Sequence, residues 1–537
     1  MTFVFDTEVY KNFFLALFKS IESGEVVRFQ ISRRVSLNRE HLQTLLENNR
    51  IVGFNSHNFD IPMLQLALLG FSAPELKWVA DKIIIQGKTA WDIAEEYNLE
   101  KPTWNHIDLI EVAPLKASLK LYGGRLHCKK MQDLPIDPGA TVTPELVEQL
   151  YEYCCNDLEV TALLLKELDG QIKLRESLSE KYGIDLRSRS DAQIAERAIG
   201  SEIAKVIGFY PRKPEKVKHK VKYDVPANVR YETPRLRMLL DEIREATFTL
   251  NDNGSVIMPD CLNTSIRLAG GVYRMGIGGL HSSETRVFHV ADTETLLIDR
   301  DVASYYPSII LNQQLFPSHL GPGFLDVYRG IVEQRLAAKK AGDKVSAESL
   351  KITINGSFGK FGSKWSVLYS PQLLIQVTVS GQLYLLMLIE MIEASGIPVI
   401  SANTDGIMVK CPRSRYDDLS ATIAAWEQIT GFATEETQYR AVYSRDVNNY
   451  LAIKQDGSTK GKGAFANPWE KEGPNIFKFH KNPQTTVCIE AVTTYLANGV
   501  PLEETIKNCR DVRKFISVRK VSGGAKDSNG FLGKAVR

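Results

Sequence analysis

Leu297-Ile298-Asp299-Arg300-Asp301-Val302-Ala303-Ser304-Tyr305-Tyr306-Pro307-Ser308 is the stretch that says most about the fold. Its apolar residues predict a buried strand that delivers aspartates to its carboxyl end, and Pro307 marks a turn directly after it. Farther along, the apolar runs 397–402 and 407–410 flank Asn403-Thr404-Asp405-Gly406. This pattern predicts a hairpin with an aspartate in its turn. Asn, Asp and Gly are ordinary turn residues, so the hairpin by itself does not indicate a functional site. It does so only together with the first strand.

The composition indicates a globular chain of several domains. Of its 537 residues, 44% are hydrophobic and 24% are charged, which excludes a disordered or fibrous protein. The formal net charge is only +2, so affinity for a polyanion must come from local clusters. Seven cysteines without a CxxC pair argue against a zinc site or disulfide scaffold and fit a cytoplasmic protein. Asp6 and Glu8 interrupt the first apolar run, so no signal peptide is expected, and polar residues within 373–400 predict a buried segment rather than a membrane span.

Two polar helical stretches, at about 325–342 and 345–359, are expected between the strand and the hairpin. The first carries Arg335 and Lys339 four residues apart, and the second carries Lys351 and Asn355 with the same spacing. Each helix therefore presents a cationic face, which suits a triphosphate. Any one of these residues by itself is equally well explained as a solvated surface residue.

Further acidic residues lie within the first 170 residues, where strands alternating with helices predict an α/β domain. Asp6 and Glu8 lie at the end of an expected strand, and a period of two puts both carboxylates on one face. Asp60 follows at a strand-to-helix junction, and Tyr153 and Asp157 are four residues apart on one helix face. Three such acidic elements can converge on two divalent cations, because Mg²⁺ and Mn²⁺ take oxygen ligands.

The segment 211–222, Pro-Arg-Lys-Pro-Glu-Lys-Val-Lys-His-Lys-Val-Lys, is the most basic stretch outside these sets. It carries six Lys or Arg against one Glu, together with two prolines. Two interpretations remain open, an exposed connector and a surface that faces phosphates.

These motifs together resemble the family B DNA polymerases. Asp6-Thr7-Glu8, Asn55 to Asp60 and Tyr153 to Asp157 look like the DTE, NxxxFD and YxxxD motifs of the family's 3′–5′ exonuclease. Residues 301–308, 351–359 and 403–406 are similar to the DxxSLYPS, KxxxNSxYG and DTDS motifs of its polymerase part. The resemblance implies an α/β and α+β multidomain chain, with an RNase H-like exonuclease domain and a right-hand polymerase. The implied boundaries are 1–170 for the exonuclease, 171–265 for a connecting region, 266–315 and 366–440 for the palm, 316–365 for the fingers, and 441–537 for the thumb.

The resemblance also implies a role for each matching residue. The metal ligands, two Mg²⁺ or Mn²⁺ in each site, would be Asp6, Glu8, Asp60 and Asp157 in the exonuclease, and Asp301, Asp405 and the Val302 carbonyl in the polymerase. Tyr153 would orient the attacking water, and Tyr306 would exclude a ribose 2′-hydroxyl. The nucleotide-binding residues would be Ser304, Tyr305, Tyr306, Arg335, Lys339, Lys351 and Asn355. The DNA-contacting residues would be Asn55, Gly278, Gly279, Phe358, Gly359, Thr378 and Tyr450.

The chain departs from the family's motifs at several positions. Asn403 replaces the first aspartate of the hairpin motif, and Gly406 replaces its serine. Gln382 replaces the arginine of a Txx(G/A)R motif, and Asn448 replaces the lysine of a KxY motif. The missing lysine would weaken the hold on the primer, and Lys454, Lys460 and Lys462 are candidates to replace its contact. Gly276 to His281 resembles the glycine-rich connection between the exonuclease and polymerase parts, and a plain turn explains it about as well. Lys116, in Lys116-Ala117-Ser118-Leu119, matches the lysine of a KxxΦ pattern (Φ is an apolar residue) found in some phage relatives.

The resemblance leads to a concrete functional expectation. We expect a compact, phage-like, monomeric DNA polymerase with an intrinsic proofreading exonuclease, acting in the host cytoplasm on primer-template DNA and dNTPs, away from membranes. Only 50 residues separate Asp301 from Lys351, and 50 separate Asn355 from Asp405, too few for the insertions of protein-primed relatives. We therefore expect weak strand displacement and helicase, primase or clamp-like partners. Three alternatives stay open: an exonuclease with a degenerate, DNA-binding polymerase half, a replication scaffold and a primase-like enzyme.

Overall fold

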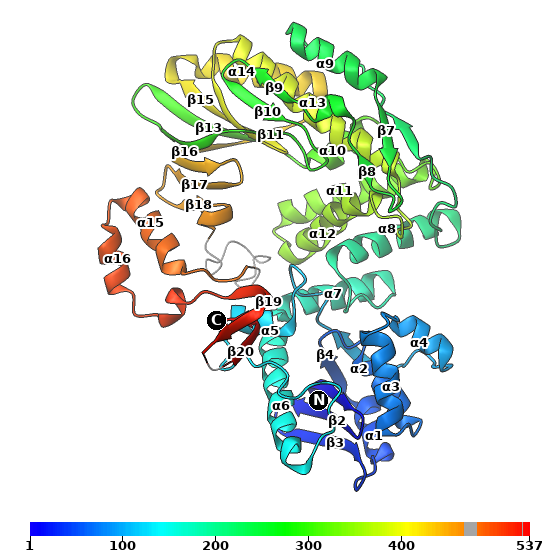
Figure 1. Cartoon of the computed structure of the whole chain (residues 1–537). Coiled ribbons are helices and arrows are strands. Elements are labelled where there is room, and N and C mark those ends of the chain that lie inside the picture. Colours follow the sequence, from blue (N-terminus) through cyan, green and yellow to red (C-terminus); the bar gives the residue numbers. More distant parts are fainter. Residues whose placement is uncertain (467–480, 529) are drawn as a thin grey trace. The chain divides into compact units, whose positions relative to one another are not determined.

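The computed structural model describes residues 1–466, 481–528 and 530–537, which form two compact units. Unit 1 comprises Met1–Ser190 with residues 481–487 and Cys509–Arg537, and unit 2 comprises residues 191–466 with Cys488–Asn508 (Figure 1). The boundary at Ser190 falls inside the stretch 171–265 that we expected to be a connecting region. The chain is a mixed α/β, multidomain protein, as expected.

Unit 1 is built on a five-stranded sheet with the order β3-β2-β1-β4-β5. The expected N-terminal hairpin is present and continues into a third antiparallel strand, while β4 and β5 run parallel to β1. The strands are β1 (Thr2–Tyr10), β2 (Phe13–Ser20), β3 (Val26–Ser32), β4 (Arg50–Gly53) and β5 (Asn105–Asp108). The helices are α1 (Arg39–Asn48), α2 (Asp60–Leu68), α3 (Ala73–Ile84), α4 (Ala90–Glu96), α5 (Leu119–Arg125), α6 (Pro144–Glu167) and α7 (Asp169–Tyr182).

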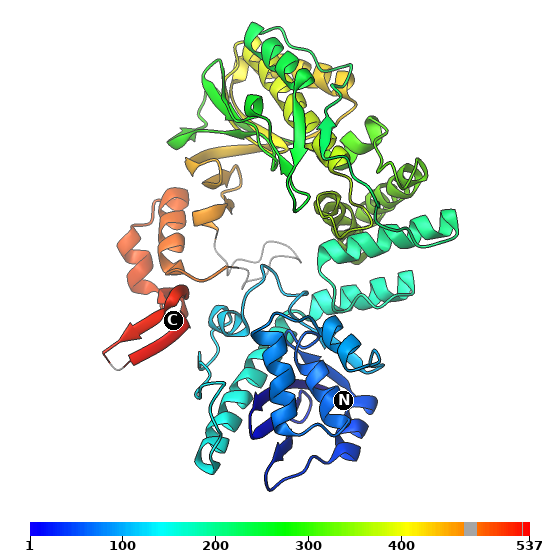
Figure 2. The same cartoon turned by 45° about the vertical axis from the view of Figure 1, so that its right-hand side comes forward.

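Both faces of this sheet are covered because successive residues of β1 point to opposite sides. Phe3 and Phe5 join a core with α1, α2 and α3, whereas Val4 joins a second core that includes α6. The expected α/β arrangement of the first 170 residues is therefore confirmed. The C-terminal hairpin, β19 (Arg519–Asp527) and β20 (Gly530–Val536), also belongs to unit 1; it is red in Figure 2.

Unit 2 is dominated by a ten-stranded sheet that runs β18-β17-β16-β13-β15-β14-β11-β10-β9, with β12 paired to β16. Its strands are β9 (Ser265–Leu268), β10 (Gly271–Arg274), β11 (His281–Ser282), β12 (Thr285–Val290), β13 (Thr295–Val302), β14 (Val399–Asn403), β15 (Gly406–Pro412), β16 (Thr434–Asp446), β17 (Asn449–Lys454) and β18 (Thr459–Gly461). A smaller sheet contains β6 (Lys220–Lys222), β7 (Thr247–Leu250) and β8 (Val256–Ile257).

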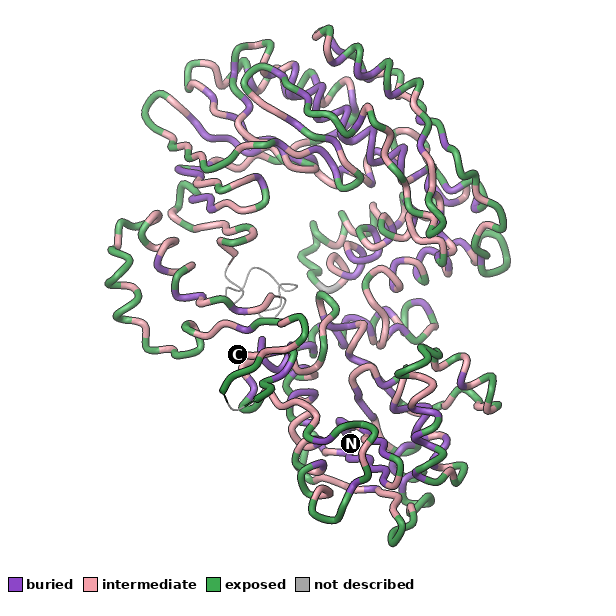
Figure 3. The backbone as a smooth tube through the Cα atoms, viewed as in Figure 1, coloured by how far each residue is buried: buried purple, intermediate pink, exposed green. Residues whose placement is uncertain are grey.

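The helices of unit 2 include the two polar helices expected near 325–342 and 345–359. They are α8 (Asp191–Ile207), α9 (Pro234–Glu245), α10 (Tyr305–Asn312), α11 (Gly323–Ala341), α12 (Lys344–Phe361), α13 (Pro371–Ala394), α14 (Tyr416–Thr430), α15 (Thr486–Asn498) and α16 (Leu502–Asn508). Among the described residues, α13 is the one helix long and apolar enough to cross a membrane, but 94% of its most apolar window is buried inside the protein (Figure 3). The expectation of a buried segment at 373–400 is confirmed.

The expected thumb segment 441–537 is divided in this structure. Strands β17 and β18 extend the large sheet of unit 2, whereas Cys509–Arg537 belongs to unit 1. Local sequence patterns could not reveal this division, because it depends on contacts between residues far apart in the chain.

Candidate active sites

Four carboxylates from three elements lie within electrostatic reach of one another in unit 1. Asp6 and Glu8 project from β1, Asp60 begins α2, and Asp157 lies on α6. Burial, and then the neighbouring carboxylates, raise the pKa values of Asp6 and Glu8 well above their ordinary values. Burial raises the pKa of Asp60 to about 7 and that of Asp157 to about 6. The structure thus brings together the four residues that the three separate motifs predicted.

Two neighbouring side chains hold these carboxylates in place. The Thr7 hydroxyl donates a hydrogen bond to Asp60 Oδ1 at 2.5 Å, which links β1 to the start of α2. Tyr153, one helical turn before Asp157 on α6, hydrogen-bonds the Asp157 carboxylate and thereby lowers its pKa. The hydroxyl of Tyr153 therefore lies inside the acidic set, where it was expected.

Asp108, at the carboxyl end of β5, is a further carboxylate that the sequence motifs did not identify. It accepts hydrogen bonds from the backbone N–H groups of Asn55 at 2.8 Å, His57 at 2.9 Å and Ile110 at 3.1 Å. Asn55 has a φ of 59°, a left-handed conformation that these contacts stabilise. Asp108 therefore fixes the loop that leads to Asp60.

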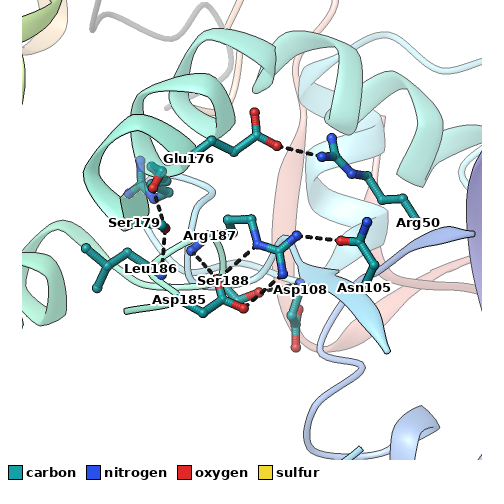
Figure 4. Close-up of polar contacts among 10 residues, drawn as sticks. Arg50, Asn105, Asp108, Glu176, Ser179, Asp185, Leu186, Arg187 and Ser188 are labelled. Atoms are coloured by element: carbon teal, nitrogen blue, oxygen red, sulfur yellow. Dashed lines mark hydrogen bonds and ion pairs between the residues drawn. The ribbon is translucent and has the colours of Figure 1, made fainter. Parts of the chain in front are cut away.

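The segment that follows α7 braces Asp108 in turn (Figure 4). The backbone N–H of Asp108 donates to Ser188 Oγ at 2.9 Å, and Arg187 hydrogen-bonds both Asp185 and Asn105. The signal that could have found Asp108 is its position, since the ends of parallel strands β4 and β5 meet at one edge of the sheet.

Lys120 on α5, rather than Lys116, acts electrostatically on the acidic set. Lys116 is exposed and pairs with Glu111 at 3.0 Å. Lys120 lowers the pKa of Asp157 and forms an ion pair with Asp133 at 2.7 Å. A Cβ on Gly533 of β20 would lie 1.7 Å from Asp133 Oδ2, so the C-terminal hairpin packs directly on this ion pair.

The second acidic set gathers at the carboxyl end of β13 in unit 2. The register pairs Asp301 with Gly406, and the Val302 N–H donates to the Asp405 carbonyl at 2.7 Å. The two strands therefore hold Asp301 beside Asp405. Burial raises the pKa of both carboxyls, and the charge of Asp301 raises that of Asp405 further.

A third aspartate and two lysines complete this second set. Burial raises the pKa of Asp299 to about 6, and Tyr439 donates a hydrogen bond to its Oδ2 at 3.1 Å. Lys460 Nζ lies 4.0 Å from the same oxygen. Lys460, Lys462 and Tyr450 line a cavity of about 360 Å³ together with Asp299, Asp301 and Asp405. Three lysines were candidates to replace the lysine of the KxY motif in holding the primer. Two of them, Lys460 and Lys462, therefore lie beside the aspartates.

The departures in the hairpin motif have packing reasons. A Cβ at Gly406 would lie 2.1 Å from Asp301 Oδ1, so the glycine leaves room for that carboxylate. The Asn403 side chain donates to the Val447 carbonyl at 3.1 Å, which ties the hairpin to the β16–β17 turn. A neutral amide can make this bond, whereas an ionised aspartate has no donor.

The glycine-rich segment 276–281 supports the hairpin from within the large sheet of unit 2. Gln382 hydrogen-bonds both the N–H and the carbonyl of Gly276, at 2.8 and 2.9 Å. Gly279, with a φ of 126°, lies against Thr404, where a Cβ would be 3.1 Å from the Thr404 Cα. The segment joins β10 and β11 inside unit 2, whereas we expected it to connect the exonuclease and polymerase parts. Thr378, which was expected to contact DNA, is fully buried on α13.

A cavity of about 400 Å³ gathers most of the expected nucleotide-binding residues. Arg335 donates from Nη1 to Ser304 Oγ at 3.2 Å, and Tyr306 stacks on Phe358 with 4.4 Å between ring centroids. Tyr305 is buried and donates its hydroxyl proton to the Gly381 carbonyl at 2.6 Å. The cavity is lined by Val302, Ser304, Tyr305, Tyr306, Arg335, Asn355, Phe358, Thr404 and Asp405, among others.

Two expected phosphate ligands are not among the lining residues of this cavity. Lys339 is exposed and lies 3.7 Å from Glu435, and Lys351 pairs with Glu348 at 3.3 Å. Gly356, where the family has serine, packs against α8, because a Cβ there would lie 2.7 Å from the Asp191 carbonyl. Gly359 is open to solvent.

Within the described residues, no group of three or more His, Cys, Asp or Glu is arranged to hold a metal ion. The donor chemistry fits Mg²⁺ nonetheless, because the candidate ligand atoms in both acidic sets are oxygens. Buried carboxylates that raise one another's pKa values are also costly to ionise, and a bound divalent cation would remove that cost.

Comparison with known proteins supports the motif assignment. No family model matches the chain. Over 147 residues it is 28% identical to DNA polymerase II of Escherichia coli (strain K12), and this match covers 23% of the chain and 19% of that protein. The match therefore spans about a fifth of the length of this curated relative. The motifs in family order and this match both point to a similarity with DNA polymerases of family B. A solved structure, the family B DNA polymerase from the hyperthermophilic archaeon Pyrobaculum calidifontis, is similar with a TM-score of 0.43 and 15% identity, covering 98% of this chain and 68% of that one.

Proposed function

We propose that the chain is a DNA-templated DNA polymerase that extends a primer 3′-hydroxyl with dNTPs and carries a 3′–5′ proofreading exonuclease. The observation that carries this proposal is the position of Asp405, which lines two cavities, with Asp301 beside it in one of them. One cavity is lined by Ser304, Tyr306 and Arg335, and the other is lined by Lys460 and Lys462. Two substrates that enter from these cavities would meet at the aspartates.

The polymerase roles follow from this geometry. Arg335, fixed by Ser304, would bind the triphosphate, and the Tyr306 ring on Phe358 would pack against the sugar and exclude a 2′-hydroxyl. Lys460 and Lys462 would hold the phosphates at the primer end. Asp301, Asp405 and the Val302 carbonyl would hold two Mg²⁺, which supply charge stabilisation for phosphoryl transfer when bound.

The exonuclease roles fall to unit 1. Asp6, Glu8, Asp60 and Asp157 would form the second divalent-cation site, and Tyr153 would orient a water molecule toward the terminal phosphodiester. Asn55, held by Asp108 at its backbone N–H, would contact the unpaired primer end.

Primer extension tests both halves at once. A 5′-labelled primer on a template is incubated with Mg²⁺, with and without dNTPs, for the wild type, Asp405→Ala and Asp6→Ala. The proposal predicts that the wild type extends, that Asp405→Ala only degrades and that Asp6→Ala only extends. A wild type that degrades the primer but never extends it would support the alternative, an exonuclease whose polymerase half only binds DNA. The ion pairs of Lys339 and Lys351 outside the nucleotide cavity favour that alternative.

The biological setting is part of the same proposal. The chain would act as a monomer in the replication of a phage genome in the host cytoplasm, with helicase, primase or clamp-like partners. The short distances between its polymerase motifs support a need for such partners.

A further inference from the structure

Trp365, just after α12 in unit 2, is an exposed tryptophan flanked by two lysines. Its side chain is 75% exposed, although an indole ring contributes much more to stability when it is buried. Lys213 Nζ and Lys364 Nζ each lie 5.3 Å from the centre of its ring. The two cations come from segments about 150 residues apart in sequence, so the fold assembles this arrangement.

The surroundings of Trp365 are basic. Lys213 belongs to the segment 211–222, whose six cations face a single glutamate. Within the part of the chain that the structure describes, Lys213, Lys216, Lys218 and Lys220 form no ion pair with an acidic side chain. Lys364 Nζ donates only to a backbone carbonyl, that of Asp252, at 3.3 Å. Their positive charge therefore remains available to a ligand.

The two lysines that flank Trp365 line a cavity of about 330 Å³. Its other lining residues include His219 and Tyr369, and also the acidic residues Glu215 and Asp252. Tyr369 and Pro214 also line a larger cavity of about 920 Å³, together with Lys216 and Lys218. The two cavities share Pro214, Val217 and Tyr369 as lining residues, so the basic segment runs past two adjoining hollows of unit 2.

Another exposed tryptophan shows what is special about this arrangement. Trp78 on α3 is 62% exposed and has Lys82 Nζ 5.7 Å from its ring centre. Lys82, however, forms an ion pair with Glu96, so its charge is already compensated. At Trp365 both flanking cations lack such an acidic partner among the described residues.

An exposed ring between two such cations fits a ligand that offers a flat aromatic face with anionic groups on either side. Single-stranded nucleic acid has this chemistry, since its bases stack on aromatic side chains while its phosphates pair with lysines. In a duplex the bases are already stacked on one another. We infer that Trp365, Lys213 and Lys364 form a stacking site for single-stranded DNA. If the proposed function holds, this strand is the unpaired template ahead of the primer end.

Fluorescence anisotropy of the full-length chain tests this inference. The probe is a labelled oligothymidylate with a blocked 3′ end, in EDTA so that no cleavage occurs. Because stacking on one aromatic ring contributes strongly to such binding, Trp365→Ala should weaken it at least about fivefold. Trp78→Ala, the matched control, should bind as the wild type does. Lys213→Ala combined with Lys364→Ala should flatten the plot of log K against log salt by about 1.4, roughly 0.7 for each lost phosphate contact.

A second comparison identifies the strand. A primer-template with a single-stranded 5′ template tail should bind more tightly than a blunt duplex, and Trp365→Ala should abolish that gain while leaving the blunt duplex unaffected. Equal binding of oligothymidylate by Trp365→Ala and the wild type would overturn the inference, as would an unchanged salt dependence in the double lysine variant. Both measurements omit dNTPs, so a failure of primer extension would refute the proposed function without affecting this test.

Discussion

Gly406→Ala is expected to separate catalytic geometry from stability in the proposed polymerase site. The added Cβ would lie 2.1 Å from Asp301 Oδ1, while Cβ atoms in proteins essentially never come within 3.0 Å of another heavy atom. The Asp301 carboxylate must therefore move by at least about 0.9 Å, the difference between these two distances. Because the nearest atom is the end of a side chain, the backbone can stay in place, and we expect a loss of stability below about 1 kcal/mol.

The same movement should be costly for catalysis. A displacement of about 1 Å in a reacting group can lower a rate about 100-fold. Single-turnover primer extension with saturating dNTP should therefore be about 100-fold slower in Gly406→Ala. Degradation of the same primer without dNTPs should continue at the wild-type rate, because the carboxylates proposed for the exonuclease lie in unit 1.

Gly330→Ala is the matched control. This glycine lies within α11 and has no atom within 4 Å of the position a Cβ would take, so the same substitution should leave extension unchanged. Thermal melting of both variants checks that they fold. If Gly406→Ala extends primers at the wild-type rate, then the position of Asp301 beside the hairpin does not limit catalysis, and the reasoning from this contact is refuted.

Three further predictions concern the two acidic sets. The pKa of Asp60 is about 7 in the folded chain against an ordinary 3.8, so the folded state binds the extra proton and the free energy of unfolding should fall as the pH rises from about 4 to 7. Asp60→Asn should therefore increase the free energy of unfolding more at pH 8 than at pH 5, by roughly 2 to 3 kcal/mol. Thermal melting at both pH values checks this, and an equal rise of the melting temperature at the two pH values would contradict it. Asp108→Ala leaves three backbone N–H groups without their carboxylate, so the free energy of unfolding, measured by thermal melting, should fall by about 3 kcal/mol. Exonuclease assays should show a slower rate, while primer extension is retained. Asp108→Asn should restore part of the stability and part of the exonuclease rate. Lys460 lowers the pKa of Asp299, so Lys460→Met should move the acidic limb of the pH profile for extension to higher pH, and an unmoved limb would show that Asp299 does not titrate in catalysis.

What the sequence predicted well depends on short stretches of chain. The shared face of Asp6 and Glu8 follows from strand periodicity, and the turn that carries Asp405 follows from its residue types. In both cases the information lies within about ten residues, where local geometry restricts the outcome.

What the sequence missed depends on contacts between distant segments. Asp108 supports the loop before Asp60 only because β5 pairs with β4, and Lys120 approaches Asp157 only because α5 packs beside α6. Asp299 shares a face of β13 with Asp301, and its partners Lys460 and Tyr439 come from distant segments of the chain. None of these partners is close in sequence to the residue it serves.

The path of the chain between the two units restricts how the protein can be divided. Because Cys509–Arg537 returns to unit 1 after unit 2 is complete, no single cut yields both units whole. A fragment that ends at Ser190 would lose the hairpin that covers the Lys120–Asp133 ion pair. Separating the two candidate activities physically would therefore require a circularly permuted or two-piece chain. Exchange of either unit between related proteins would likewise need coordinated changes at distant points of the gene.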